Sequence, residues 1–485
     1  MSSPSPASPD SLRALLTERA DRLGDSPYLL SARLARTLTY RRLDDLADHW
    51  RRVAAPWGPS PRVGVLVSDP LEFAGAFLGL ISAGVWVAPL DPTVDPLSAE
   101  ALARTVATLG LSHVVADRAA PSAALVSWHR VEDPAPDSPS EPAPSSGGVL
   151  LASSGTTGAP KVMALSEAQL LVAAGLIARH NRLDEHERGF NALPLWHINA
   201  EVVGLLATLV AGASLVLDER FHRTRFWDVI AEHRVTWINA VPAIISRLAD
   251  LGEGERVPSG VRFIRSASAP LSAALLARFE AATGIRVVES YGMTEAASQI
   301  CVNPLSGARH PGSVGRGVGV EVRVVDGEVL GAGAVGQVEI RGPSVISRYE
   351  SPAYDSRFSP GGWLATGDLG YLDVDGYLYL VGRTDDVINR GGEKIFPREI
   401  EEVALEVPGV TGAAVVGQVP VLYVELDGDV EEGIARLRET LGEELTRVRR
   451  PVEIRVVESL PRHATGKIQK RGLGGANLTR VEALR

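Results

Sequence analysis

Short apolar runs alternate with amphipathic segments through the first part of the chain. Residues 63–67 and 85–90 form apolar runs with the length of buried strands. Between them, residues 71–83 have the spacing of a helix, and Gly84 follows at the position where a glycine commonly closes a helix. This strand–helix–strand order predicts a parallel sheet with helices on both faces.

The same alternation returns in the middle of the chain. We expect a helix over about residues 167–179, a second helix over 200–211, and strands at 214–217 and 237–241. These segments predict a second α/β unit. From residue 311 to 342, short alternating segments rich in glycine and valine predict a small β-barrel.

Length and composition narrow the class of protein. A chain of 485 residues is too long for one hydrophobic core, so we expect at least two domains. A net charge of −10 without a long basic run argues against a nucleic-acid partner. The most apolar stretch, residues 202–217, is interrupted by Gly204 and Gly212, so no membrane span is expected. One cysteine, Cys301, and no signal-peptide pattern near the N-terminus predict a cytoplasmic protein.

One segment has the composition of an anion-binding loop. An apolar run at residues 149–152 predicts the end of a buried strand, and small residues and hydroxyls follow it up to Pro160. Glycines let backbone N–H groups approach an anion, hydroxyls donate to phosphate oxygens, and lysine adds a compact positive charge. A polar surface turn is the plainer alternative. The candidate phosphate-binding residues are Ser153, Ser154, Gly155, Thr156, Thr157, Gly158 and Lys161.

A second motif, Ser290-Tyr291-Gly292-Met293-Thr294-Glu295, follows an expected strand. The ring of Tyr291 can stack on a planar base, and the hydroxyl of Thr294 can hydrogen-bond a phosphate. The carboxylate of Glu295 can hold Mg²⁺, a hard cation that takes carboxylate and phosphate oxygens together. A turn and a helix cap would explain a lone Tyr-Gly or Thr-Glu pair, but the whole string in this order is far more specific.

Shorter segments supply the remaining candidates, and each has a structural alternative. His197 beside Trp196 can be an ordinary buried histidine, and Asp368 between two glycines can form an Asx turn. A lysine near the C-terminus, Lys467, can be a solvated cation. The remaining candidate site residues are His197, Ser268, Ala269, Pro270, Asp368, Arg383, Gly391, Gly392 and Lys467.

In this order, the motifs resemble those of the adenylate-forming superfamily, which includes acyl-CoA ligases, luciferases and the adenylation domains of peptide synthetases. Ordered matches run from about residue 38 to 470, and the Gly391-Gly392-Glu393-Lys394 string resembles the acyl-CoA ligase version. The resemblance implies an α/β fold in which a large N-terminal domain, residues 1–384, contains two doubly wound α/β subdomains and a small β-barrel. A small mobile α+β C-terminal domain, residues 385–485, would follow, with a hinge at Asp385.

The resemblance also implies cofactors and roles. ATP, Mg²⁺ and coenzyme A would be bound, with adenine near residues 268–270 and 290–292 and ribose near Asp368 and Arg383. His197 would border the acyl pocket, and the two glycines at 391–392 would line the tunnel for the pantetheine arm. Thr294 and Glu295 would contact phosphate and Mg²⁺. Lys467 would stabilise the charge that builds on the carboxylate and the α-phosphate.

These roles predict an acyl-CoA ligase that makes an acyl-adenylate and transfers the acyl group to CoA. Trp196, Ile198 and Val241 favour a hydrophobic or aromatic acid. A small dicarboxylate is the alternative, although no anchor for a second carboxylate stands out. An α-amino acid is disfavoured because the segment near His197 lacks the aspartate that peptide-synthetase domains use to hold the amine.

Two departures from the family pattern leave a second function open. Val162 stands where the family usually has glycine, and the turn after Gly417 is short. Both are compatible with an enzyme of one half-reaction, which either makes an adenylate for a carrier protein or only joins a supplied acyl-adenylate to CoA. A non-catalytic sensor is disfavoured because the acidic and basic motif residues are intact. The expected assembly is a monomer or a homodimer.

Overall fold

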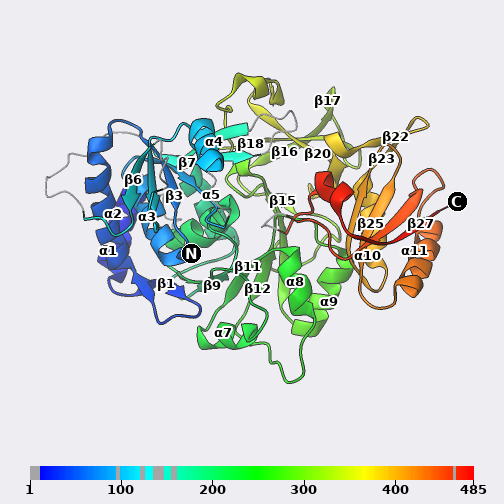
Figure 1. Cartoon of the computed structure of the whole chain (residues 1–485), viewed down its shortest axis with the longest axis horizontal. Coiled ribbons are helices and arrows are strands. Elements are labelled where there is room, and N and C mark those ends of the chain that lie inside the picture. The colour runs from blue at the N-terminus through cyan, green and yellow to red at the C-terminus, as the bar shows by residue number, and fades with distance from the viewer. Residues whose placement is uncertain are drawn as a thin grey trace.

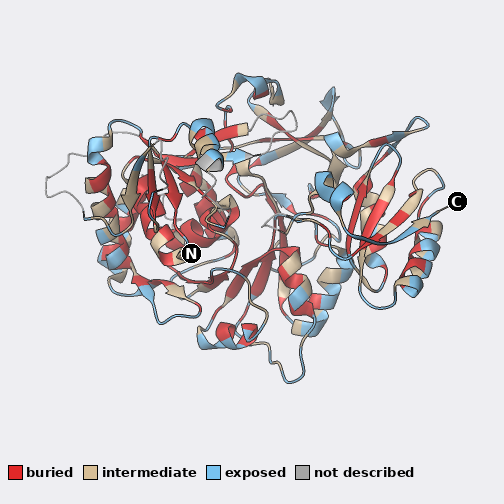
Figure 2. Cartoon of the chain, in the orientation of Figure 1, coloured by how far each residue is buried: buried red, intermediate tan, exposed pale blue. Residues whose placement is uncertain are grey.

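The structure, a computed structural model, describes residues 11–93, 99–120, 126–134, 147–153, 161–462 and 466–484. Two α/β units and a third sheet make up the large N-terminal part, and a smaller C-terminal part lies at the right of Figure 1. Each part has its own hydrophobic core, and Figure 2 shows buried residues gathered in the strands of both. The α/β fold with a separate C-terminal domain is therefore as predicted. Among the described residues, no helix is long and apolar enough to cross a membrane.

The first unit is a six-stranded sheet with the order β6-β5-β3-β4-β7-β8, parallel except for the β7–β8 pair. Helix α3 is apolar on almost every side and is buried because it lies between the sheet and helix α2. It begins where Asp69 accepts hydrogen bonds from the next backbone N–H groups and Pro70 fits the first turn. The elements are α1 (Leu12–Leu23), α2 (Tyr40–Ala54), η1 (Ala55–Trp57), β3 (Arg62–Leu66), α3 (Pro70–Ser82), β4 (Trp86–Pro89), α4 (Ala99–Leu109), β5 (His113–Ala116), β6 (Ser127–Arg130), β7 (Gly148–Ser153) and β8 (Lys161–Ser166).

The second unit is a nine-stranded sheet with the order β15-β14-β13-β12-β11-β9-β10-β1-β2. Strands β1, β10, β9, β11, β12 and β13 are parallel. Helix α5 starts at Glu167, as expected. Ser166 is its N-cap and forms a capping box with Gln169. The elements are β1 (Pro27–Ser31), β2 (Thr37–Thr39), α5 (Glu167–His180), β9 (Arg188–Asn191), η2 (Ala200–Leu206), α6 (Ala207–Ala211), β10 (Ser214–Leu217), α7 (Phe226–Glu232), β11 (Trp237–Ala240), α8 (Pro242–Ala249), β12 (Phe263–Ser266), α9 (Ala273–Thr283), β13 (Arg286–Tyr291), η3 (Thr294–Ala296), β14 (Cys301–Val302) and β15 (Arg316–Gly317).

The helix expected over residues 200–211 has two parts. Its first part, η2, is a π-helix, and the α-helical part α6 ends at Gly212, which has a left-handed backbone conformation.

The third sheet occupies the place of the expected small β-barrel and is antiparallel, with the order β17-β16-β18-β20-β19 and with β21 paired to β20. Its elements are β16 (Glu321–Asp326), β17 (Glu328–Val329), β18 (Gly336–Arg341), η4 (Pro352–Arg357), β19 (Phe358–Ser359), β20 (Trp363–Leu372) and β21 (Leu378–Arg383).

The C-terminal part begins with a short turn, η5 (Thr384–Asp386), which contains the expected hinge residue Asp385. A four-stranded sheet with the order β24-β25-β26-β27 packs against α10 and α11. Its elements are β22 (Ile388–Arg390), β23 (Glu393–Ile395), α10 (Pro397–Glu406), β24 (Val410–Val416), β25 (Val421–Leu426), α11 (Val430–Glu444), β26 (Glu453–Val457), η6 (Lys470–Gly475) and β27 (Leu478–Ala483).

Candidate active site

The carboxyl ends of the parallel strands in the second sheet share one edge, which is where open α/β sheets commonly bind ligands. The segment after β9 carries His197, and its backbone N–H donates to the Pro194 carbonyl at 3.2 Å. The segment after β12 carries Ser268, Ala269 and Pro270, and Ser268 adopts a positive φ of 72°. The segment after β13 carries Thr294 and Glu295. The topology therefore brings three of the candidate segments to one edge.

The predicted phosphate loop connects β7 to β8. Ser153 and Lys161 are antiparallel partners where the two strands meet it. Five of the candidates, Ser154, Gly155, Thr156, Thr157 and Gly158, lie outside the described residues, so their roles remain predictions. The ammonium of Lys161 lies 5.4 Å from the ring centroid of Tyr354. Burial, and next Arg357, lower the pKa of Lys161, while Glu295 opposes this shift, so these three charged groups share one region.

Asp368 connects Tyr291 to Arg383. The Tyr291 hydroxyl donates to Asp368 Oδ2 at 2.5 Å, and Arg383 Nη1 donates to Oδ1 at 2.9 Å. Strand pairing of β20 with β21 places Asp368 opposite Arg383. Gly367 has a φ of 82°, and a methyl group there would lie 2.9 Å from Arg383 Nη2, so glycine is required before Asp368. Each carboxylate oxygen keeps a lone pair for a further donor, such as a sugar hydroxyl.

Glu295 is buried and has the chemistry of a magnesium ligand. The Tyr349 hydroxyl donates to Glu295 Oε1 at 2.9 Å, and Arg357 Nη1 lies 3.7 Å from the same oxygen. No other described residue is hydrogen-bonded to Oε2, so this oxygen can take a cation. Tyr349 and Arg357 were missed from the sequence because they lie in a segment without a motif, and folding alone brings them beside Glu295.

Gly292 is fixed by close packing within the second motif. A side chain at this position would overlap the carbonyl oxygen of Ser298, so no other residue fits. On the preceding strand, the Ser290 hydroxyl donates to the Ser266 carbonyl at 3.1 Å and ties β13 to the small-residue segment after β12.

Lys467 reaches this site from the C-terminal part. A methyl group on the preceding Gly466 would lie 3.3 Å from the Cβ of Ala243, at the start of α8, so this segment rests on the large domain. Lys467 is exposed to solvent, although protein atoms surround much of its side chain. Burial and Arg383 lower the pKa of its ammonium, whereas Asp368 opposes the shift. The ammonium therefore lies within the electrostatic field of Asp368 and Arg383.

The pair Gly391 and Gly392 lies elsewhere. Both glycines have positive φ values, 61° and 89°, and form the turn between β22 and β23. They are exposed, with open space where side chains would point. Figure 1 shows this hairpin at the outer side of the C-terminal part. The structure thus brings Lys467 to the site and leaves the glycine pair away from it.

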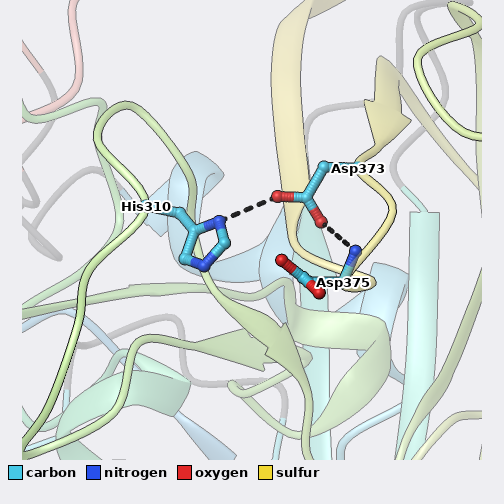
Figure 3. Close-up of side chains that lie close together, drawn as sticks. All are labelled: His310, Asp373 and Asp375. Atoms are coloured by element: carbon cyan, nitrogen blue, oxygen red, sulfur yellow. Dashed lines mark hydrogen bonds and ion pairs between the residues drawn. The ribbon is translucent and has the colours of Figure 1, made fainter.

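Among the described residues, one group of three side chains has the composition and spacing of a metal site: Asp373 and Asp375 lie in the turn between β20 and β21, and His310 lies in the segment between β14 and β15. His310 Nδ1 lies 2.9 Å from Asp373 Oδ2. Figure 3 shows Asp375 beside this pair. The other oxygen, Asp373 Oδ1, accepts the N–H groups of Asp375 and Tyr377, each at 2.9 Å. The His310 ring also stacks on Tyr377 with centroids 3.7 Å apart. These contacts stabilise the turn and explain the cluster without a metal.

Comparison with known proteins gives two family matches. The model of the AMP-binding enzyme family matches residues 16–350, and that of the AMP-binding enzyme C-terminal domain matches residues 399–467. The sulfoacetate–CoA ligase of Cupriavidus necator is 37% identical over 95% of this chain and 97% of its own length. The oxalate–CoA ligase of Arabidopsis thaliana is 34% identical over 95% and 98%.

Solved structures agree with these matches. The o-succinylbenzoate CoA synthetase of Bacillus subtilis, in complex with its acyl-adenylate intermediate, is 28% identical, has a TM-score of 0.81, and covers 95% of this chain and 97% of its own. The same enzyme in complex with ATP and a magnesium ion has a TM-score of 0.82 at 27% identity, with coverages of 95% and 99%.

Proposed function

The chain belongs to the AMP-binding enzyme family, and from this premise we propose how its residues divide the work. The protein is an ATP-dependent, AMP-forming acid–CoA ligase that uses ATP, Mg²⁺ and coenzyme A. The carboxylate of the acid attacks the α-phosphate of ATP, and the bond to pyrophosphate breaks. The sulfur of CoA then attacks the acyl carbon, and AMP leaves.

In the proposed division, the large domain holds the nucleotide. Asp368 accepts the ribose hydroxyls on its remaining lone pairs, while Arg383 and Tyr291 fix the orientation of its carboxylate. Lys161 neutralises phosphate charge next to Glu295. When bound, Mg²⁺ neutralises and orients the phosphates, and the unused Oε2 of Glu295 is the oxygen that would hold it.

The observation that carries the proposal is the position of Lys467. Its ammonium belongs to the C-terminal part, yet it lies in the field of Asp368 and Arg383. A cation at this point stabilises the negative charge that gathers on the attacking carboxylate and the α-phosphate. The arrangement therefore supports a state that is competent for adenylate formation.

The second step would use another arrangement of the same domains. Gly391 and Gly392 lie on the outer surface here, so they can line a CoA tunnel only after the C-terminal part has turned. We place the hinge at Asp385, in the short turn that separates the two hydrophobic cores. Such a hinge motion rebuilds one site for two chemistries.

The test is ATP-dependent pyrophosphate release over a panel of acids, with and without CoA, while the acyl product is followed by mass. Pyrophosphate together with acyl-CoA is the expected result. Acyl-adenylate that accumulates without thioester in the presence of CoA would assign the acceptor role to a carrier protein. Release of AMP from supplied acyl-adenylate and CoA, without pyrophosphate from any acid, would overturn the assignment of Lys467 to adenylation.

A further inference from the structure

A row of polar side chains crosses the second sheet beneath helices η2 and α5. Strand pairing places Asn191 of β9 opposite Asn239 of β11, and Asn239 opposite Arg265 of β12. Residues opposite one another in parallel strands point to the same face of the sheet, so these three side chains lie on one face. All three are almost fully buried, with exposed fractions of 0%, 1% and 1%.

This row lies next to the segment after β9 that carries His197. The amide of Asn239 donates to Asn191 Oδ1 at 3.0 Å and to Asn199 Oδ1 at 2.8 Å, and Asn199 is two residues beyond His197. Two residues after Asn239, Val241 packs against Gly466, which precedes Lys467. Asn239 of the polar row therefore lies two residues before Val241, which is close to the segment that carries Lys467.

Arg265 is a buried cation without a counter-ion. Its Nη1 donates to Gln299 Oε1 at 2.7 Å, and Nε has no hydrogen-bond partner among the described residues. No ion pair of the described residues includes Arg265. Burial lowers its pKa to about 9, so the guanidinium remains charged at neutral pH. A buried charge is costly unless it is paired, so an anionic group beside this guanidinium would be stabilised.

Nearby titratable groups are also buried. Glu201 of η2 is fully buried, burial raises the pKa of its carboxyl well above the ordinary value, and it forms no ion pair with Arg265. Burial lowers the pKa of His180 on α5, the Asn303 carbonyl opposes this, and Arg265 adds to the lowering. Beside Arg265, the Nε2 donor of Gln299 also has no hydrogen-bond partner among the described residues.

From this geometry we infer that Arg265, together with Gln299, binds a second anionic group of the acid substrate. This inference rests on the proposed function and names the substrate class: a compact acid with a carboxylate or sulfonate in addition to the reacting carboxylate. The reacting carboxylate faces Lys467, and the second anion completes the hydrogen bonds of the guanidinium. Arg265 is then the specificity determinant that the sequence did not reveal.

The inference replaces the expectation of a hydrophobic or aromatic acid. That expectation used Trp196 and Ile198, which follow β9, and Val241, which follows β11. It left out Arg265 and Asn239, which belong to strands. The sequence of a strand does not show toward which face of the sheet an arginine points.

The experiment compares the wild type with Arg265→Met, Arg265→Lys and a matched control, Arg286→Met. Arg286 lies on the neighbouring strand β13 and donates to the carbonyls of Pro304 and Gly307, outside the site. Malonate and sulfoacetate are the dianionic probes and separate carboxylate from sulfonate, while butyrate and benzoate are the monoanionic probes. Pyrophosphate release gives kcat/KM, and calorimetric titration with a non-hydrolysable ATP analogue gives acid binding without turnover.

We expect the wild type and Arg286→Met to prefer a dianion, and Arg265→Met to lose about 100-fold in kcat/KM for it while keeping its butyrate activity. Arg265→Lys, which keeps the charge, should restore part of the preference and controls for folding. A wild type that prefers benzoate or butyrate would overturn the inference, as would an equal loss for all acids in Arg265→Met. If a dianion binds to the wild type but not to Arg265→Met, and no pyrophosphate forms, the inference stands and the proposed function fails.

Discussion

Replacement of Lys467 by alanine should separate the two half-reactions. The lysine ammonium lies in the electrostatic field of Asp368 and Arg383, and in the proposed mechanism it stabilises the charge that develops on the carboxylate and the α-phosphate. Two unit charges about 4 Å apart interact by about 4 kcal/mol at an effective dielectric constant of about 20. Because Lys467 keeps contact with solvent, screening reduces this figure, and we take about 3 kcal/mol. Adenylate formation should therefore slow about 100-fold.

The assay measures each half-reaction by itself. ATP–pyrophosphate exchange reports adenylate formation, and mass detection of acyl-CoA from supplied acyl-adenylate reports the second step. Lys394→Ala is the matched control, since Lys394 is an exposed lysine of the same domain on the outer β22–β23 hairpin and should leave the exchange rate unchanged. Equal losses of both half-reactions in Lys467→Ala, or the same loss of exchange in Lys394→Ala, would refute the reasoning.

Three further predictions address stability. Burial raises the pKa of Glu289 to about 7, and Arg398 opposes this shift. Between about pH 4.5 and 7 the native state therefore holds a proton that the unfolded chain releases, so the free energy of unfolding falls as the pH rises through this range. Glu289→Gln should flatten this dependence in thermal melts between pH 5 and 8, and an unchanged slope would contradict the assignment. Tyr291→Phe removes a hydrogen bond to the Asp368 carboxylate and should cost about 2 kcal/mol of unfolding free energy in urea titrations, with weaker ATP binding. Gly292→Ala should prevent correct folding, because its methyl group would overlap the Ser298 carbonyl, whereas Gly260→Ala, in open space, should melt within a few degrees of the wild type.

Motifs that are contiguous in sequence could be predicted, because their chemistry and spacing are local. Tyr291 and Glu295 belong to one string that was expected to follow a strand, and the structure places them at the end of β13 and in η3. Helix α5 could be predicted because its periodicity and capping residues are also local. The order of elements then gave the α/β class, since alternation of strands and helices has few packing solutions.

Residues that act through pairing of distant strands could not be predicted. Arg265 and Asn239 are 26 positions apart, and only the register of β11 with β12 places them on one face. Arg357 and Tyr349 reach Glu295 through a fold contact over more than 50 positions. The surface position of the Gly391–Gly392 turn depends on the orientation of the C-terminal part relative to the large domain. A local sequence pattern cannot predict that orientation.

The distribution of cations over the two domains explains how one site can serve both steps. Lys161 and Arg383 belong to the large domain and lie near Glu295 and Asp368. Lys467 belongs to the C-terminal part, and the preceding Gly466 lies close to Ala243 of the large domain. In the proposed rotation, Lys467 leaves the site. Adenylate formation carries the full charge of ATP and the attacking carboxylate, whereas the adenylate that remains after pyrophosphate has left carries far less. Withdrawal of one positive charge therefore matches the fall in negative charge between the steps, and it frees the space through which a thiol can approach the acyl carbon.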